Sequence, residues 1–336
     1  MKEILIILTT ILLIGCGGGS STVVLNSSSD YFKYQWNINP DSFYYDNGSV
    51  TRGADINLIP AWNYTKGSGV TVAIIDDCFD ANHEDLKDQV ISTYNINTGS
   101  SYVGGKECHG TEVAGIVGAS DNGFGIIGVA PKVNLILISF DFDNTSDDEL
   151  VYAYDYAKNH GAKVINCSWG SNHISQTLSN KLKDMKNANI TVVFASGNGD
   201  KYNNKIDLDE NGIDDESEDP SVIGVGATDE TNDVSFYSNY GSNIDILAPG
   251  GGDLGVPSTA DYGYAEVIGT SFSAPTVSGV IALMYAKDPT LTFDDIYQKI
   301  TQTADKIGTQ NGAVYNNGFD TYRAYGKINA TNAINY

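Results

Sequence analysis

Basic residues are scarce in this sequence of 336 residues, which holds 19 lysines and arginines against 42 aspartates and glutamates. The formal net charge at pH 7 is −23. Such acidity argues against nucleic acid as a partner, because binding a polyanion requires basic side chains. It agrees with a secreted protein that binds cations such as calcium, and equally with an acidic surface that serves solubility alone.

Long apolar runs are also lacking. The one candidate, at 4–14, is too short to span a bilayer comfortably and is typical of a signal peptide that occupies residues 1–15. The segment 13–16 resembles the bacterial lipobox, in which the cysteine, here Cys16, carries the lipid; an ordinary signal peptide with an incidental cysteine is the alternative. Residues 16–29 begin with a Gly/Ser-rich stretch that predicts a flexible tether. We therefore expect a lipid-anchored protein of a bacterial cell envelope, at the outer membrane or the cell surface.

Repeats are absent, and the remaining about 310 residues suit one large α/β domain, which we predict to span 30–336. Apolar segments alternate with helical ones. The predicted strands lie at 70–75, 133–139, 163–168, 191–195, 222–226 and 244–247, and the predicted helices at 110–119, 147–159, 174–188, 273–286 and 292–303. This alternation predicts a mainly parallel sheet that is covered by helices on both faces. Functional groups then belong at the carboxyl ends of strands, where Asp76 and Asn198 fall.

Three separated motifs supply a hydroxyl, an imidazole and a carboxylate. Ser271 lies between small residues, just before an apolar run that predicts a buried helix. A serine hydroxyl is a poor nucleophile unless a base takes its proton. His109 opens a helix of small residues, and Asp76 follows an apolar strand, so the chain order is that of subtilisin. Taken singly, each residue could instead cap a helix or close a turn.

With these motifs in this order, the chain resembles the subtilisin-like serine endopeptidases (subtilases), with some features of the kexin/furin branch. The resemblance implies a three-layer subtilisin-like fold and peptide-bond hydrolysis through an acyl-enzyme, with Asp76, His109 and Ser271 as a catalytic triad. The segment 191–199 resembles the strand and loop that carry the oxyanion-hole asparagine, which would be Asn198. The alternative is a catalytically silent scaffold that acts in peptide binding or calcium-dependent adhesion.

The resemblance also suggests how a peptide or protein substrate would bind. The substrate-binding residues would be Ser168, Trp169, Gly170, Ala195, Ser196 and Gly197. The first three would pair with the substrate backbone as an added strand, and the others would form the opposite wall of the S1 pocket. Asp77 matches the second aspartate of the kexin Asp-Asp-Gly motif and would favour a basic P2 residue, although Cys78 replaces the glycine. No carboxylate follows Gly170 at 171–173, which argues against dibasic specificity.

The segment 207–218 fits the calcium-loop pattern D-x-[DN]-x-[DN]-G-x₅-E. The expected Ca²⁺ ligands are oxygens of Asp207, Asp209, Asn211, Ile213, Asp215 and Glu218. Gly212 would permit the sharp turn, and Pro220 argues against a full helix-loop-helix; an acidic, solvated insertion is the alternative. By resemblance alone, a second structural calcium site would use Asp30, Asp85 and Asn122.

Four cysteines leave three if Cys16 is lipidated. Cys167 ends a buried strand pattern and indicates a core thiol. The triad would bring Cys78 and Cys108 close together, and an oxidising compartment would permit a disulfide, but the sequence leaves the bridged and the free states open. We expect a monomer.

Overall fold

The computed structural model describes residues 30–336 with the exception of 172, 201, 203 and 213. Cys16 and the predicted signal peptide and tether therefore lie outside the described residues. Within the described part of the chain, no helix combines the length and apolar character that a membrane crossing requires.

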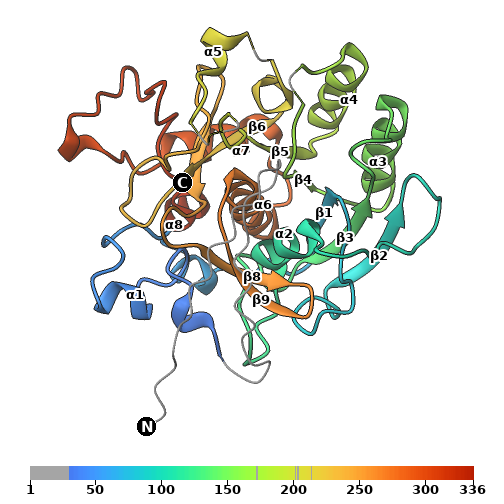
Figure 1. The fold of residues 1–336 in the computed structure, drawn as a ribbon, viewed down its shortest axis with the longest axis horizontal. Helices are drawn as coiled ribbons and strands as arrows, with labels where there is room; N and C mark the ends of the chain where they lie inside the picture. The colour runs from blue at the N-terminus through green and yellow to red at the C-terminus, as the bar shows by residue number, and fades with distance from the viewer. Residues whose placement is uncertain (1–29, 172, 201, 203, 213) are drawn as a thin grey trace.

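A seven-stranded parallel sheet forms the centre of the molecule, in the order β2-β3-β1-β4-β5-β6-β7 (Figure 1). Its strands are β1 (Thr71–Asp76), β2 (Val90–Asn95), β3 (Asn134–Ser139), β4 (Val164–Cys167), β5 (Thr191–Ala195), β6 (Ile223–Thr228) and β7 (Ile246–Pro249). Alternate side chains of β1 enter opposite cores: Val72 faces one and Ala73 the other. The predicted mainly parallel sheet is thus confirmed, and its central strands are mainly apolar because both faces are buried there.

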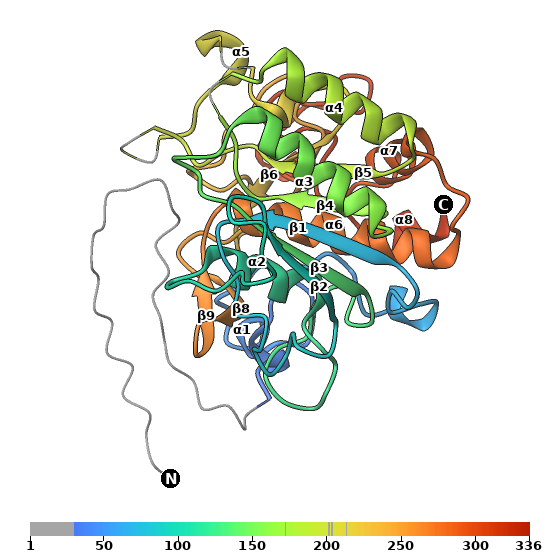
Figure 2. The same ribbon diagram turned by 90° about the vertical axis from the view of Figure 1, so that its right-hand side faces the viewer.

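Helices cover both faces of this sheet (Figure 2). The helices are α1 (Phe43–Asp46), α2 (His109–Gly118), α3 (Asp147–Asn159), α4 (Gln176–Asn187), α5 (Leu208–Asn211), α6 (Thr270–Lys287), α7 (Phe293–Gln302) and α8 (Ala330–Asn335). α2 and α6 share one core with the sheet, and α3 and α4 share the other. α6 is buried along almost its whole length, which agrees with a sequence made mainly of apolar and small hydroxyl residues.

Several elements escaped sequence prediction, among them the short helices α1, α5 and α8, the strand β2 and an antiparallel hairpin. β2 is an edge strand whose side chains are only partly buried, so its apolar pattern is weak. The antiparallel hairpin of β8 (Val256–Ala260) and β9 (Gly263–Val267) is short and contains Pro257. This hairpin packs against α2 and forms a second small sheet.

The strand order predicts a crevice at the carboxyl edge of the sheet. After β1 the chain builds β2 and β3 on one side, and it then crosses to place β4 on the other side of β1. Connections that leave neighbouring strands in opposite directions open a space between them, and such switch points hold the ligands of α/β proteins. Asp76 ends β1 and Ser168 directly follows β4, so both lie at this crevice.

Candidate active site

Asp76 and His109 are joined by a hydrogen bond at the crevice. His109 Nδ1 lies 2.9 Å from Asp76 Oδ1, which also accepts a bond from the backbone N–H of Asp77 at 2.9 Å. Asp76 is fully buried, and its Oδ2 contacts no hydrogen-bond donor among the described residues. A buried carboxylate on Nδ1 fixes the imidazole tautomer and leaves Nε2 to act as a base.

Three carboxylates change the proton affinity of His109. Burial by itself lowers the pKa of this histidine, but Asp76, Glu112 and Asp77 stabilise the imidazolium and raise the pKa to about 9. Glu112 lies one turn further along α2, and burial raises its own pKa to about 7. The imidazole is therefore held in a strongly negative environment.

Ser271 lies in the first turn of the central helix α6. Its hydroxyl donates to the carbonyl oxygen of Ser168 at 3.1 Å, and the Ser168 hydroxyl donates back to the Ser271 carbonyl at 2.7 Å. Among the described contacts, no hydrogen bond joins Ser271 to His109, although the His109 ring lies 5.4 Å from the ring of Phe272. Such bonds are often loose without substrate, and a rotation of the serine side chain would redirect the hydroxyl.

Asn198 follows β5 and lies beside the start of α6. Its Oδ1 accepts bonds from both the backbone N–H and the hydroxyl of Thr270, each at 2.8 Å. These bonds occupy the amide oxygen, and an added Cβ on Gly269 would lie 3.2 Å from Nδ2. The amide N–H groups of Asn198 are thereby held next to Gly269, which directly precedes Thr270 and Ser271.

The two predicted substrate walls leave neighbouring strands. Because β4 and β5 are parallel with Cys167 opposite Phe194, the segments 168–170 and 195–197 continue side by side beyond the sheet. The Trp169 indole turns inward, donates to the Ile75 carbonyl and packs on Phe194. Only the backbone of Trp169 and the open position at Gly170 are then left to face the crevice.

Asp77 and a disulfide connect β1 to the start of α2. The Asp77 carboxylate accepts backbone N–H bonds from Cys78 at 2.5 Å, Gly110 at 3.0 Å and His109 at 3.3 Å. Cys78 and Cys108 are bridged, with Cα atoms 4.9 Å apart, which decides the alternative that the sequence left open. Burial and the Asp76 charge raise the pKa of Asp77. Cys167 is the expected buried thiol and contacts the Tyr154 hydroxyl.

The predicted calcium loop forms two short helical turns. Asp207 caps α5, Gly212 adopts a left-handed conformation at the expected sharp turn, and Asp215 caps the 3-10 helix η3 (Glu216–Glu218). Asp209 and Glu218 both approach Gly241, whose Cβ position lies 3.6 Å from Asp209 Oδ1 and 3.1 Å from Glu218 Oε1.

The described ligands of this loop do not gather around one point. Among the described residues, no group of three or more His, Cys, Asp or Glu side chains is arranged to hold a metal ion, and Ile213 lies outside them. Asp215 turns away toward Gly170. Glu218 nevertheless leaves a buried Oε1 without a donor, and burial together with four neighbouring aspartates raises its pKa to about 7. That oxygen is suited to a cation.

Two residues of the second expected calcium site, Asp85 and Asn122, are in contact, and the backbone of Asp30 lies beside the neighbouring Gly125. Asp85 is fully buried and accepts bonds from Asn122 Nδ2 at 2.9 Å and from the Ile126 N–H at 3.0 Å. Asp30 forms a backbone bridge with Gly125, and a Cβ on Gly125 would lie 2.2 Å from Asp85 Oδ2. Burial raises the pKa of Asp85. Among the described residues, no lysine or arginine pairs with Asp30 or Asp85, so these carboxylates have the chemistry that a hard cation prefers.

Sequence reasoning missed Glu112 and Glu216 near the site, and it assigned Asp215 only to the calcium loop. Glu112 could have been found, because residues three apart on a helix share a face and His109 is three positions earlier. The other two approach Gly170, and Glu216 binds Ser171 across a sequence separation of 45. No local pattern reports a contact of that range.

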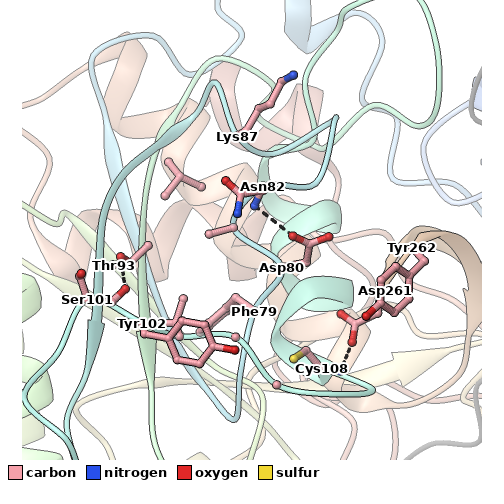
Figure 3. A pocket seen from close by; sticks show the side chains of 15 residues that line it. Phe79, Asp80, Asn82, Lys87, Thr93, Ser101, Tyr102, Cys108, Asp261 and Tyr262 are labelled. Carbon is pink, nitrogen blue, oxygen red and sulfur yellow. Dashed lines mark hydrogen bonds between the residues drawn. The ribbon is translucent and has the colours of Figure 1, made fainter.

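An open cavity of about 560 Å³ borders the disulfide on the side of the β8–β9 hairpin. Phe79, Asp80, Tyr102 and Asp261 are among its lining residues (Figure 3). The backbone N–H of Cys108 donates to Asp261 at this wall. Asp76, His109 and Ser271 are not part of the lining, so this cavity is distinct from the crevice that holds them.

Comparisons with known proteins agree on one family. The sequence-family model described as "Subtilase family" matches residues 67–326 of this chain. The chain is 36% identical over 284 residues to the thermophilic serine proteinase of Bacillus sp. (strain AK1), covering 82% of this chain and 64% of that relative. It is 32% identical over 281 residues to thermitase of Thermoactinomyces vulgaris, covering 82% of this chain and 92% of thermitase. The chain thus spans less than two thirds of the first relative's length.

A solved structure agrees with the same fold. A protease from Pseudoalteromonas arctica PAMC 21717 superimposes with a TM-score of 0.75 at 26% sequence identity. The superposition covers 92% of this chain and 98% of that one. The predicted three-layer arrangement is therefore confirmed by a structural neighbour as well as by the sheet itself.

Proposed function

The chain belongs to the subtilase family, and from this premise we propose that it is a serine endopeptidase that works through Asp76, His109 and Ser271. The observation that carries the proposal is the 2.9 Å bond between His109 and the buried carboxylate of Asp76, at the crevice that Ser271 also borders. An imidazole held in this way accepts a proton at Nε2 and is stabilised when it becomes charged.

The proposed reaction is acyl transfer from the substrate amide to water. The Ser271 hydroxyl leaves the Ser168 carbonyl, gives its proton to His109, and its oxygen bonds to the scissile carbonyl carbon. His109 then donates that proton to the departing amine as the carbon–nitrogen bond breaks. A water molecule gives a proton to His109, attacks the acyl-enzyme, and releases the acid while Ser271 regains its proton.

Asn198 and the backbone N–H of Ser271 would stabilise the oxyanion of the tetrahedral intermediate. The bonds from Thr270 hold the Asn198 amide oxygen, so its N–H groups need no reorganisation when charge develops. Ser271 lies in the first turn of α6, where backbone N–H groups have no partner within the helix. The segments 168–170 and 195–197 would bind the substrate main chain on either side.

Calcium would serve structure and not chemistry. We place one ion at Asp85, Asn122 and Asp30, beside Gly125, where a buried carboxylate has no cationic partner in the described chain. A second would be held by Glu218 and Asp209 near Gly241, because the buried Oε1 of an ionised Glu218 has no donor among the described residues. A bound cation would favour the ionised form of each carboxyl group.

We further propose that the protein is lipidated at Cys16 and held at a bacterial cell envelope. The support is the sequence alone, in which an apolar run of signal-peptide length ends at a lipobox-like cysteine. A Gly/Ser-rich tether would let the catalytic domain reach substrates away from the membrane surface. Conversion of Cys16 to serine should release the protein from the membrane fraction.

The proposed activity is tested with the full-length protein and its Ser271→Ala variant on a diverse peptide library. We expect the wild type to cleave peptides and to be labelled by a serine-directed phosphonate, whereas the variant should do neither because it lacks the attacking oxygen. Circular dichroism should show that the two proteins are equally folded. Cleavage that persists in the variant would disprove the assignment, and a folded wild type without activity would point to the silent scaffold.

A further inference from the structure

Two carboxylates lie directly behind Gly170 at the crevice. A Cβ added to Gly170 would be 3.6 Å from Asp215 Oδ2 and 3.7 Å from Glu216 Oε2. Gly170 is two residues beyond Ser168, which is hydrogen-bonded to the nucleophile Ser271. Because Gly170 has no side chain, nothing of that residue covers these oxygens.

The two carboxylates are buried but unequal in their bonding. Asp215 is 7% exposed and Glu216 is 2% exposed. Both oxygens of Glu216 are occupied by Ser171, with its N–H at 2.8 Å and its hydroxyl at 3.0 and 3.2 Å. Asp215 accepts from Ser217 through Oδ1 only, so Oδ2 accepts no hydrogen bond from the described residues.

No cation of the described chain neutralises this pair. The ion pairs of the described residues include neither Asp215 nor Glu216. The adjacent Asp214 is paired with His173 at 2.6 Å, and both of those side chains are exposed to solvent. The site is therefore suited to a positive group from outside the chain.

The position of Asp215 and Glu216 decides which residue of a bound substrate could contact them. The walls 168–170 and 195–197 leave paired strands, and the 3-10 helix η3, which follows Asp215, packs against β5 and β6. A side chain that enters along Gly170, next to Ser271, would therefore approach Asp215. In an acyl transfer at Ser271, the residue in this pocket is P1, the one that precedes the scissile bond.

Resting on the endopeptidase function proposed above, we propose that Asp215, supported by Glu216, selects arginine or lysine at P1. A guanidinium or ammonium group would satisfy the free Oδ2 with a charge-assisted hydrogen bond. A neutral side chain would leave a buried carboxylate without a partner, which is costly. The missing carboxylate after Gly170 in the sequence is thus supplied from the loop 207–218, which lies further along the chain.

The experiment compares kcat/KM for two peptides that differ only at P1, one with arginine and one with citrulline, its neutral isostere. We expect the full-length wild type to prefer arginine by about 10- to 100-fold, the range of one hydrogen bond to a charged group. Asp215→Asn should bring the ratio close to one. Glu210→Gln removes an exposed charge from the same loop and should keep the wild-type ratio.

The wild-type comparison needs no variant, so it decides the matter even if Asp215→Asn fails to fold. A wild-type ratio near one, with both peptides cleaved, overturns the P1 assignment and leaves the endopeptidase intact. A preference that disappears when calcium is added also overturns it, since the metal would then be the cation that Asp215 binds. Failure to cleave either peptide, or any other peptide, disproves the proposed activity and the P1 assignment with it.

Discussion

His109 is surrounded by more negative charge than a single triad carboxylate supplies. Asp76 accepts its Nδ1 hydrogen bond, while Glu112 and Asp77 add Coulombic stabilisation of the imidazolium. The resulting pKa of about 9 favours the protonated ring near neutral pH, although a general base must be unprotonated. Activity should therefore increase into the alkaline range as the imidazole loses its proton.

Replacing Glu112 by glutamine tests this electrostatic effect. Removing a nearby negative charge lowers the pKa of His109, so the ascending limb of kcat/KM against pH should move down by at least about half a pH unit. Activity at neutral pH should rise relative to the alkaline maximum, because a larger fraction of the imidazole is neutral.

The control for that profile is Asp294→Asn, which removes an exposed charge on α7. For this variant, the ascending limb of kcat/KM against pH should coincide with that of the wild type. A Glu112→Gln profile that also coincides with the wild type would show that Glu112 has no influence on the base.

At the scale of elements, α2 is held to the end of β1 by more than packing. Cys108 at the helix N-cap makes no side-chain capping bond. The Asp77 carboxylate, which follows β1, accepts hydrogen bonds from the first backbone N–H groups of α2 instead. The Cys78–Cys108 bridge joins the same two segments covalently. The sequence-based role for Asp77, selection of a basic P2 residue, stays a prediction, and its carboxylate is already committed to three backbone donors.

Asp77→Ala should separate these two roles. Loss of a helix cap costs about 1 kcal/mol, up to about 2 kcal/mol, so the midpoint of urea unfolding should fall. The rate constant kcat should also fall for every peptide, because the backbone of His109 loses an anchor. Asp77→Asn keeps one acceptor oxygen and should recover part of both losses. If Asp77 instead reads P2, unfolding would not change and only peptides with a basic P2 would lose kcat/KM.

At the scale of the whole molecule, several of the many acidic residues are withdrawn from solvent. Burial raises the pKa of Glu112, Glu218 and Asp245 to about 7 and that of Asp215 to about 6. The same groups titrate near about 4 in an unfolded chain. The native state therefore binds more protons than the unfolded state between these values, and its stability must fall as the pH rises through them. His109 acts in the same direction, since its raised pKa contributes stability that is lost as the pH approaches about 9.

Without calcium, we expect the melting temperature to be higher at about pH 6 than at about pH 8. Calcium should raise it most at the higher pH, because the ion binds the ionised carboxylates and removes their mutual repulsion. Scanning calorimetry of Ser271→Ala, with calcium or with excess chelator, measures both effects without self-digestion. Equal melting temperatures with calcium and chelator at the higher pH would rule out the calcium sites.

Much of the architecture could be predicted because it depends on local patterns. The strand 191–195 and the helix 147–159 were predicted with the bounds that β5 and α3 have in the structure. The start of α6 was not, because Thr270 and Ser271 are small polar residues that an apolar periodicity does not detect. The loop pattern at 207–218 correctly placed a sharp turn at Gly212, yet the described carboxylates around it face different neighbours.

The sequence by itself determined the family, the α/β class and the identity of the candidate triad, because these depend on residue types in a particular order along the chain. The tertiary structure alone decided that Cys78 and Cys108 are bridged, that Asp77 caps α2, and that Asp215 lies behind Gly170. Each of these contacts joins segments that are distant in the chain. Their geometry is set by strand order and helix packing, which bring distant residues to the same edge of the sheet, and no local pattern of residues encodes that proximity.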